Sequence, residues 1–274
     1  MTGAGLDDRL SSIAAEYDAT ISVWMGTLDG TASFVRDGEH EHPAASTLKL
    51  PLLIAVHRAA ESGDLNLDEE LTVHDEFASV LDDESYVMTE DYDNDPQPWA
   101  RLGQRATIGW LAERAIILSS NLATNLLIER IGFAAVNDVY ELAGATTARL
   151  RRGIQDEPAS GAGVFNTATA SDMARVLVAL LAGKLVPAQR TTEVERVLAA
   201  CETNDAIPAG LPPNTYLAHK TGWIDEACHD VGIVRPDGAR PFILSIFTSA
   251  LLDDPTAHRL VARVAAECWQ VRPR

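Results

Sequence analysis

The sequence is poor in cysteine and in lysine, and it has no long apolar run. Its three cysteines, Cys201, Cys228 and Cys268, are odd in number and widely spaced. No pair has zinc-ligand spacing, so we expect no metal site and a reduced compartment. No stretch approaches the roughly 18 apolar residues of a membrane helix. Residues 1–18 lack the basic start and apolar run of a signal peptide, so we expect a cytoplasmic protein.

Positive charge is also scarce. The chain has 22 Lys and Arg against 40 Asp and Glu, a net charge of −18 at pH 7. A phosphate backbone requires a basic surface, so we expect no nucleic-acid partner. An anionic membrane surface would repel the chain, and the acidity itself indicates solubility. With 274 residues and 46% hydrophobic content, the chain can bury a core without a staple, as one large domain or two interleaved ones.

Apolar periodicity and turn signals predict the order helix, two strands, a block of helices, three strands, helix. The strands are expected at 20–28, 31–36, 215–223, 230–234 and 242–249, and the helices at 6–17, 47–60, three within 107–144, 171–181, 192–201 and 255–271. Residues 148–168 are expected to be a loop. Strands from both ends should join into one antiparallel five-stranded sheet covered by the terminal helices.

The predicted fold class is therefore α/β, of the α+β type, in a single unit 1–274. We expect a sheet lobe from 1–45 and 205–274 and a helical lobe from 46–204, with a ligand cleft between them. An acidic, aromatic-containing insert is expected near 75–104, because nine acids lie between Asp75 and Asp95.

The first motif, Ser46-Thr47-Leu48-Lys49, lies at the start of the predicted helix 47–60. Residues three apart share a helix face, so Lys49 can reach the Ser46 hydroxyl. A lysine whose pKa is lowered can accept the serine proton, and the helix N-terminus favours developing negative charge. Alone, this pattern is more typical of a solvent-facing helix start with Ser46 as N-cap.

The second motif, Ser119-Ser120-Asn121, lies between two predicted helices. Ser119 could relay a proton to a leaving group, and Asn121 could hydrogen-bond a substrate amide. A helix-capping turn would carry the same residues.

The third motif, Lys220-Thr221-Gly222, ends a predicted strand and precedes Trp223. Lys220 and Thr221 could support an anion there, and Gly222 would let a substrate backbone approach closely. An ordinary strand end would also fit.

The three motifs, in this order, resemble those of class A β-lactamases and penicillin-recognising enzymes, which have Asp where this chain has Ser120. Two of the chain's three lysines, Lys49 and Lys220, complete them. The segments PAASTLKLPLLIAVHRAAESGDLNLDEEL, SSNLATNLLIERIG and HKTGWIDEACHDVGIV extend the similarity to nearly the whole chain, from about Leu6 to Val271.

The resemblance implies that Ser46 attacks a carbonyl and becomes acylated. Lys49 would act as base or proton relay, and Ser119 would pass the proton to the leaving nitrogen. The backbone N–H groups of Ser46 and Trp223 would form the oxyanion hole.

Substrate binding is implied for the neighbouring residues. Asn121 would position the acyl amide, Lys220 and Thr221 would hold an anionic group, and Gly222 would leave room for the substrate.

The loop after Arg149-Leu150-Arg151-Arg152 departs from the family's pattern. The resemblance implies a glutamate there that activates the deacylating water, but an ungapped match gives Ile154, with Pro158 in place of a loop asparagine. Asp156 and Glu157 come two and three residues late. Either a rearranged loop brings one of them in as the deacylation base, or both are solvated acids.

The strand after Lys220 departs as well. Between Thr221 and Val234 there is no Arg or Lys to face the substrate anion, only His229 and Asp230. These two are more typical of a structural hydrogen bond than of a ligand contact. Tyr92 and Trp99 of the insert could roof the cleft or anchor the insert.

These expectations define a serine hydrolase that is acylated at Ser46 by a β-lactam or related amide and deacylates poorly. The alternatives are an esterase, amidase or acyltransferase of the same fold, and a penicillin-binding sensor without turnover. A small-molecule amide or ester is the expected substrate, with no metal and no organic cofactor. The oligomeric state is left open.

Overall fold

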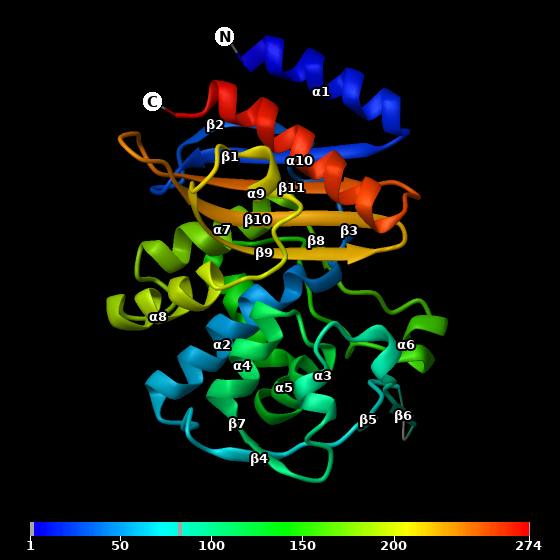
Figure 1. Cartoon of the computed structure of the whole chain (residues 1–274). Helices are drawn as coiled ribbons and strands as arrows, with labels where there is room; N and C mark the ends of the chain where they lie inside the picture. The colour runs from blue at the N-terminus through cyan, green and yellow to red at the C-terminus, as the bar shows by residue number, and fades with distance from the viewer. Residues whose placement is uncertain (1–2, 82–83, 274) are drawn as a thin grey trace.

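A five-stranded sheet forms the upper part of the computed structural model, and helices gather beneath it (Figure 1). The structure describes residues 3–81 and 84–273. The sheet order is β2-β1-β11-β10-β9, and all neighbours are antiparallel. Its strands are β1 (Thr20–Thr27), β2 (Ala32–Arg36), β9 (Tyr216–Ile224), β10 (Ala227–Arg235) and β11 (Phe242–Ser249).

Two terminal helices cover the upper face of this sheet. α1 (Gly3–Tyr17) and α10 (Asp254–Val271) pack on each other and on the strands (Figure 1). Their apolar stripes include Leu6, Leu10, Leu260 and Val264, which form one buried cluster with Phe242 of the sheet. The predicted five-stranded antiparallel sheet with terminal helices over it is thus confirmed.

Helices from the middle of the chain form a layer below the sheet, in which two of them contact the strands and the others pack mainly against each other. They are α2 (Lys49–Ser62), α4 (Ile108–Ile117), α5 (Asn121–Ala143), α7 (Ala170–Leu181) and α8 (Ala188–Ala199). α2 is buried from Lys49 to His57, so it runs through the centre of this layer. α5 is kinked at Gly132, whose φ of 81° interrupts the helix and explains why the pattern predicted three segments.

Several short elements carry no sequence pattern and were not predicted. β4 (Glu70–Thr72) pairs with β7 (Arg105–Thr107), and β5 (Glu76–Ala78) pairs with β6 (Ser85–Val87). The remaining short elements are β3 (His42–Pro43), β8 (Thr167–Ala168), η1 (Ala45–Leu48), η2 (Glu90–Tyr92), α3 (Pro96–Trp99), α6 (Glu157–Gly161) and α9 (Ile207–Gly210). Strands of two or three residues are too short to show a period of two.

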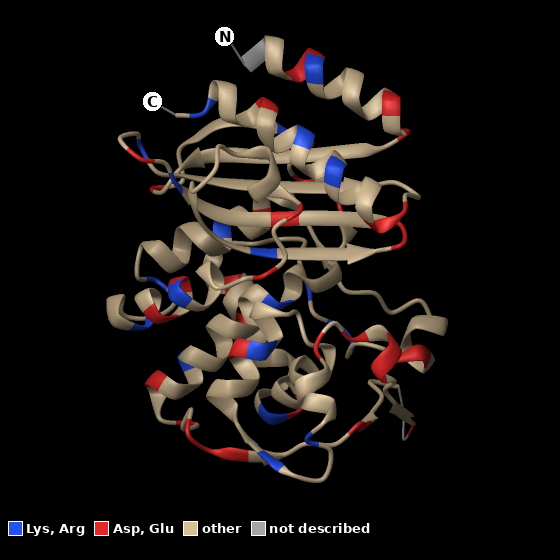
Figure 2. Cartoon of the chain, in the orientation of Figure 1, with Lys and Arg blue, Asp and Glu red and all other residues tan. Residues whose placement is uncertain are grey.

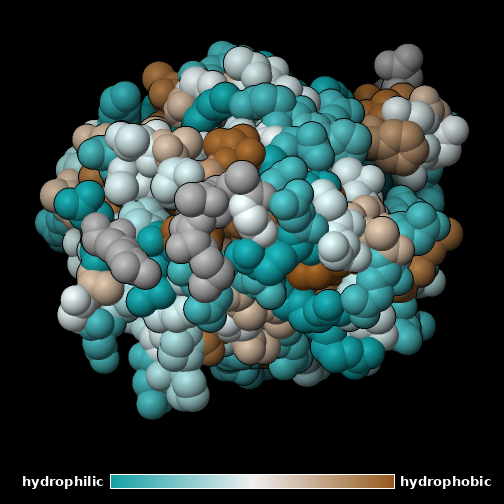
Figure 3. Space-filling model, turned by 90° about the horizontal axis from the view of Figure 1, so that it is seen from above, coloured by the Kyte–Doolittle hydropathy of each residue, from teal (hydrophilic) through white to brown (hydrophobic). Residues whose placement is uncertain are grey.

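Asp and Glu outnumber Lys and Arg in the chain, 40 to 22, and residues of both signs are scattered over the molecule (Figure 2). The face seen from above is mostly hydrophilic, with scattered apolar side chains (Figure 3). Among the residues that the structure describes, no helix combines the length and the apolarity needed to cross a membrane. All three cysteines are free and buried.

A buried ion pair joins β9 to β10. His219 Nδ1 donates to the Asp230 carboxylate at 2.8 Å, and Asp230 also accepts the Ile207 backbone N–H at 2.9 Å. Burial disfavours the charged imidazolium, but the Asp230 carboxylate outweighs it and raises the pKa of His219 to about 10. The pair therefore fixes the strand that carries Lys220 to the start of α9.

We predict that Asp230→Asn lowers the free energy of unfolding by about 3–5 kcal/mol at pH 7, because it strands a buried imidazole. Since the folded pKa of His219 is raised, the stabilisation is complete below pH 6.5 and is lost as the pH rises through about 10. Urea denaturation over this range measures both effects.

The matched control is Asp254→Asn. It breaks the ion pair between His258 and the Asp254 carboxylate, whose side chain is 56% exposed. An exposed pair should cost about 1 kcal/mol or less. Equal losses in the two variants would contradict the importance of the buried pair.

Candidate active site

Ser46 lies in η1, in the single turn that precedes α2. The backbone N–H of Lys49 donates to the carbonyl of Ser46, so the two residues are one turn apart on the same helical path. Ala45, just before the serine, has a φ of 43°, in the left-handed region that non-glycine residues rarely adopt. This conformation turns the chain sharply from β3 into the helix.

The strand end of the third motif lies directly against this turn. A Cβ placed on Gly222 would lie 2.9 Å from the Ser46 backbone nitrogen and 3.0 Å from that of Thr47. Only glycine therefore allows β9 to approach η1 so closely. β9 is an edge strand of the sheet, so the first and third motifs meet where the sheet borders the helices.

The Lys49 side chain is fully buried, and its amine is held by three partners. Lys49 Nζ lies 2.7 Å from the Ser119 carbonyl oxygen, 2.7 Å from Asn121 Oδ1 and 3.1 Å from Ser119 Oγ. The first and second motifs are thus in direct contact.

Lys220 completes the cluster from the sheet side. It is also fully buried, and its Nζ lies 3.1 Å from Ser119 Oγ and 2.9 Å from the Thr221 carbonyl oxygen. One serine hydroxyl therefore bridges both lysines. Ser119 itself has a φ of 59°, a left-handed conformation that brings its hydroxyl and its carbonyl to the same amine.

The electrostatics of the cluster favour a neutral Lys49. Burial, and then the nearby charge of Lys220, hold the pKa of Lys49 well below its usual range, against an opposing effect of Asp93. Burial also lowers the pKa of Lys220. A neutral amine is a competent general base next to a hydroxyl nucleophile.

The hydrogen-bond partners of Lys49 suit a neutral amine, which has two N–H donors and one lone pair. Its two shortest contacts are to carbonyl oxygens, which can only accept. The third is to the Ser119 hydroxyl, which can donate to the lone pair while accepting from Lys220. The arrangement can carry a proton from Lys220 through Ser119 to Lys49, or in reverse.

The other predicted binding residues lie around this cluster. Asn121 begins α5, Thr221 is buried beside Lys220, and Trp223 is 37% exposed at the end of β9. The Asn121 side chain also donates through Nδ2 to the Tyr92 carbonyl oxygen, so its oxygen faces Lys49.

The loop that follows Arg152 is fastened to α5 by Asn125. Asn125 Oδ1 accepts the Ile154 N–H at 2.9 Å, and Asn125 Nδ2 donates to the Ile154 carbonyl at 2.9 Å. Gly153 fits beneath the Tyr86 hydroxyl, which would lie 2.1 Å from a Cβ. The backbone at position 154 is therefore fixed.

Asp156 and Glu157, the predicted deacylation bases, have other environments. Asp156 is fully buried and accepts hydrogen bonds from Ser79 Oγ at 2.7 Å, from the Val80 N–H, and from the Ala159 N–H at the start of α6. Both of its oxygens are committed to these donors. Glu157 is exposed on α6. These environments favour a structural role for Asp156 and a solvated position for Glu157.

His229 and Asp230 have structural partners. His229 donates through Nε2 to the Pro43 carbonyl at 2.8 Å and stacks on Phe247, with ring centroids 4.2 Å apart. Burial lowers its pKa to about 4, so it is neutral at pH 7. Asp230 pairs with His219. The sequence-based preference for structural hydrogen bonds agrees with these contacts, although their partners differ.

Asp93 is a residue near the cluster that sequence reasoning missed. It accepts the backbone N–H groups of Asn121 and Leu122, and it influences the pKa of Lys49. Its sequence signal was only that of one acid among the nine in the insert.

A family model described as the beta-lactamase enzyme family matches residues 5–271. The chain belongs to this family. It is thus a β-lactamase-like hydrolase, and the serine and lysine cluster occupies the junction of sheet and helices in its fold.

Relatives of known name agree with the family. A β-lactamase of Kitasatospora aureofaciens is 28% identical over 96% of this chain and 83% of its own length. A solved β-lactamase of Sphaerobacter thermophilus is 24% identical, covers 98% of this chain and 97% of its own, and has a TM-score of 0.83. A variant of PBP-A, solved as an acyl-enzyme complex with penicillin G, is 24% identical over 97% and 96% of the two chains, with a TM-score of 0.81.

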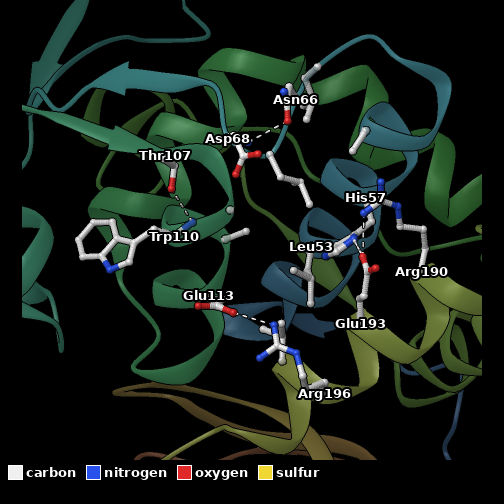
Figure 4. Close-up of a pocket in the computed structure, with 16 residues that line it drawn as sticks. Leu53, His57, Asn66, Asp68, Thr107, Trp110, Glu113, Arg190, Glu193 and Arg196 are labelled. Atoms are coloured by element: carbon white, nitrogen blue, oxygen red, sulfur yellow. Dashed lines mark hydrogen bonds and ion pairs between the residues drawn. The ribbon is translucent and has the colours of Figure 1, made fainter.

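A separate cavity of about 660 Å³ lies between α2, α4 and α8 (Figure 4). His57 and Glu193 face each other there, 3.6 Å apart, and burial lowers the pKa of His57 to about 4. The lining contains none of the three motifs. It is therefore distinct from the candidate active site.

We predict that Gly222→Ala slows acylation of Ser46 by about 10²–10³-fold, because the added methyl pushes β9 away from the Ser46 N–H. The rate of covalent labelling by a penicillin or an activated ester measures it. Gly161→Ala, where a Cβ meets nothing within 4 Å, is the control. Equal labelling rates in the two variants would contradict a close approach of β9 during the reaction.

Proposed function

We propose that the protein is a serine hydrolase acylated at Ser46 by a β-lactam or a related amide, and that it releases the acyl group slowly. The observation that carries the proposal is that two buried lysines share the Ser119 hydroxyl, and that one of them, Lys49, lies one helical turn after Ser46. A lysine whose pKa is lowered by burial and a neighbouring charge, next to a hydroxyl that can relay a proton, is typical of a functional site.

In the acylation step, neutral Lys49 takes the proton of the Ser46 hydroxyl. Ser46 Oγ then bonds to the carbonyl carbon, and the N–H groups of Ser46 and Trp223 hold the oxygen that becomes negative. As the carbon–nitrogen bond breaks, Ser119 gives its proton to the leaving nitrogen. Lys49 returns its proton to Ser119, so no net proton is consumed.

Substrate recognition follows from the groups beside the cluster. Lys220 and Thr221 lie next to each other near the end of β9, where they would hold a substrate carboxylate. Asn121 offers its amide at the start of α5 for an acyl amide. Trp223 lies at the rim, where an apolar side chain can pack on the substrate.

Deacylation requires a base that activates water, and the candidate groups are ill placed for it. Ile154 cannot accept a proton, Asp156 is engaged by three donors, and Glu157 is exposed. A missing base costs about 10²–10⁴-fold. A long-lived acyl-enzyme is the direct consequence, and the acyl-enzyme complex of a PBP-A variant of the same fold with penicillin G supports the proposal.

A second candidate function is transfer of the acyl group to an acceptor other than water, or its retention as a signal. The same loop favours it, because a persistent acyl group is what an acyltransferase or a penicillin-binding sensor requires. A small amine or alcohol that shortens the life of the adduct would identify the transferase.

We expect benzylpenicillin to give an adduct of one equivalent that persists for minutes or longer, and Ser46→Ala to give none. Intact-protein mass spectrometry from seconds to hours measures this. Ser62→Ala, an exposed serine at the far end of α2, is the control and should be acylated normally. Penicillin left untouched by the wild-type protein would overturn the proposal in favour of an esterase.

We expect Ile154→Glu to shorten the life of the penicillin adduct by about 10²-fold, since it supplies a carboxylate base in the loop. Stopped acylation followed by mass measurement gives the decay rate. Ile154→Gln has the same size and cannot act as a base, so it controls for disturbance of the loop. Equal decay in both variants would show that the slow step has another cause.

A further inference from the structure

We propose that Asp93, in the acidic insert, is a positioning residue that holds the Ser119-Ser120-Asn121 turn against Lys49 and replaces an acid at position 120. The proposal rests on the function proposed for Ser46. It assigns to the insert a direct part in acylation.

One carboxylate oxygen of Asp93 accepts hydrogen bonds from three consecutive residues at the start of α5. Asp93 Oδ2 accepts the N–H of Asn121 at 2.9 Å, the N–H of Leu122 at 2.8 Å and the Ser120 hydroxyl at 3.2 Å. It also accepts the Trp99 indole N–H at 3.0 Å. The carboxylate therefore ties together two parts of the chain that are about thirty residues apart.

The contacts meet a need of α5, whose first N–H groups have no partner within the helix. Ser120 caps only the N–H of Ala123, at 3.2 Å. Asp93 takes the two N–H groups that precede it, and an anion at a helix N-terminus is further favoured by the helix dipole. The family pattern places an acid at position 120, whereas here that residue is a serine that donates to Asp93.

The insert is anchored so that Asp93 cannot drift. Arg114 of α4 pairs with Asp95, with Nη2 and Oδ1 2.6 Å apart, and the Arg114 carbonyl oxygen accepts the Ser120 N–H at 3.1 Å. Asp95 and Trp99 are buried. Arg114 of α4 thus holds both the insert, through Asp95, and the Ser119-Ser120-Asn121 turn, through the Ser120 N–H.

The Ser119-Ser120-Asn121 turn then holds the Lys49 amine in place. The Tyr92 carbonyl oxygen holds Asn121 Nδ2, which leaves Asn121 Oδ1 facing Lys49 Nζ at 2.7 Å. The groups that face Lys49 are Lys220 from β9, Ser119 and Asn121 from the turn, and Asp93 from the insert. Asp93 is the acidic one among them, and it acts against burial and Lys220 by raising the pKa of Lys49.

The test is Asp93→Asn, with Asp91→Asn, an exposed acid of the 3₁₀ turn that Asp93 follows, as the matched control. We expect Asp93→Asn to slow acylation by benzylpenicillin on the order of 10²-fold, as for a misplacement of about 1 Å. The acid limb of the acylation rate should move to lower pH, because loss of the negative charge lowers the pKa of Lys49. Asp91→Asn should leave rate and limb unchanged.

Rescue separates positioning from a merely structural role. Ser120→Asp in the Asp93→Asn background returns a carboxylate to the start of α5, and it should restore most of the rate and move the acid limb back. A variant that is slow at every pH, with an unmoved limb and no rescue, would overturn the proposal.

The titration can also be followed without substrate. The chain has three lysines, so selective ¹⁵N labelling of lysine gives three side-chain signals, and Lys184→Arg and Lys220→Arg assign them. A lower pKa of Lys49 in folded Asp93→Asn is expected, and an unchanged pKa would overturn the proposal. If the wild-type protein ignores penicillin, the function proposed for Ser46 fails, and this measurement still tests Asp93.

If Asp93→Asn does not fold, as judged by its thermal transition, Ser120→Asp in the wild-type background remains. Two carboxylates at one helix start should raise the pKa of Lys49 and move the acid limb to higher pH. An unmoved limb and an unmoved lysine signal would overturn the proposal.

Discussion

Two lysine amines buried around one serine hydroxyl are the constraint on which this site depends. Removing an ammonium from water costs several kcal/mol even after the protein relaxes, so each amine must be neutral or well solvated by protein groups. Lys49 has two carbonyl oxygens and a hydroxyl for this purpose, and Lys220 has the hydroxyl and one carbonyl oxygen. The same burial that threatens stability lowers the pKa of Lys49, which is what the base of the proposed acylation requires.

The backbone around the cluster is held in conformations that other parts of the chain rarely adopt. Ala45 and Ser119 have φ values of 43° and 59°, and each such residue costs of order 1–3 kcal/mol. One precedes the proposed nucleophile, and the other carries the bridging hydroxyl. Gly222 adds a contact that no other residue could make. Packing against the sheet maintains the left-handed conformations of Ala45 and Ser119 together with the close approach of Gly222.

Much of the fold could be predicted from the sequence, because its long elements have clear periods. The five main strands and the terminal helices appear where alternation and helical spacing indicated them. Glu76–Ala78 and Glu70–Thr72 could not be predicted, since strands of three residues are too short to show a period of two, and Glu70–Thr72 also pairs with the distant segment Arg105–Thr107.

The motif residues could be picked out for a similar reason. Ser46 and Lys49 are three residues apart, and this spacing of one helical turn can be read directly from the sequence. The chain offered only three lysines, which narrowed the choice. Asp93 was missed because its role arises from a contact across about thirty residues, and no local pattern separates it from its acidic neighbours. Asp156 was considered as a deacylation base because the sequence does not reveal that its carboxylate is buried and accepts three hydrogen bonds.

Residues 86–93 of the insert contact the groups assigned to both steps of the proposed reaction. Tyr92 and Asp93 hold the turn proposed to serve acylation, while Thr89 pairs with Gln155 through two hydrogen bonds of 2.8 and 3.1 Å. Tyr86 and Met88 contact Asn125, which fixes Ile154 in the loop where a deacylation base would lie. Because one segment supports both the amine and this loop, a loop rearranged to admit a water and a base would pull on the groups that position Lys49. In the proposed reaction, acylation and release are therefore coupled through the packing of residues 86–93, and a change that improves one step must leave these residues undisturbed to preserve the other.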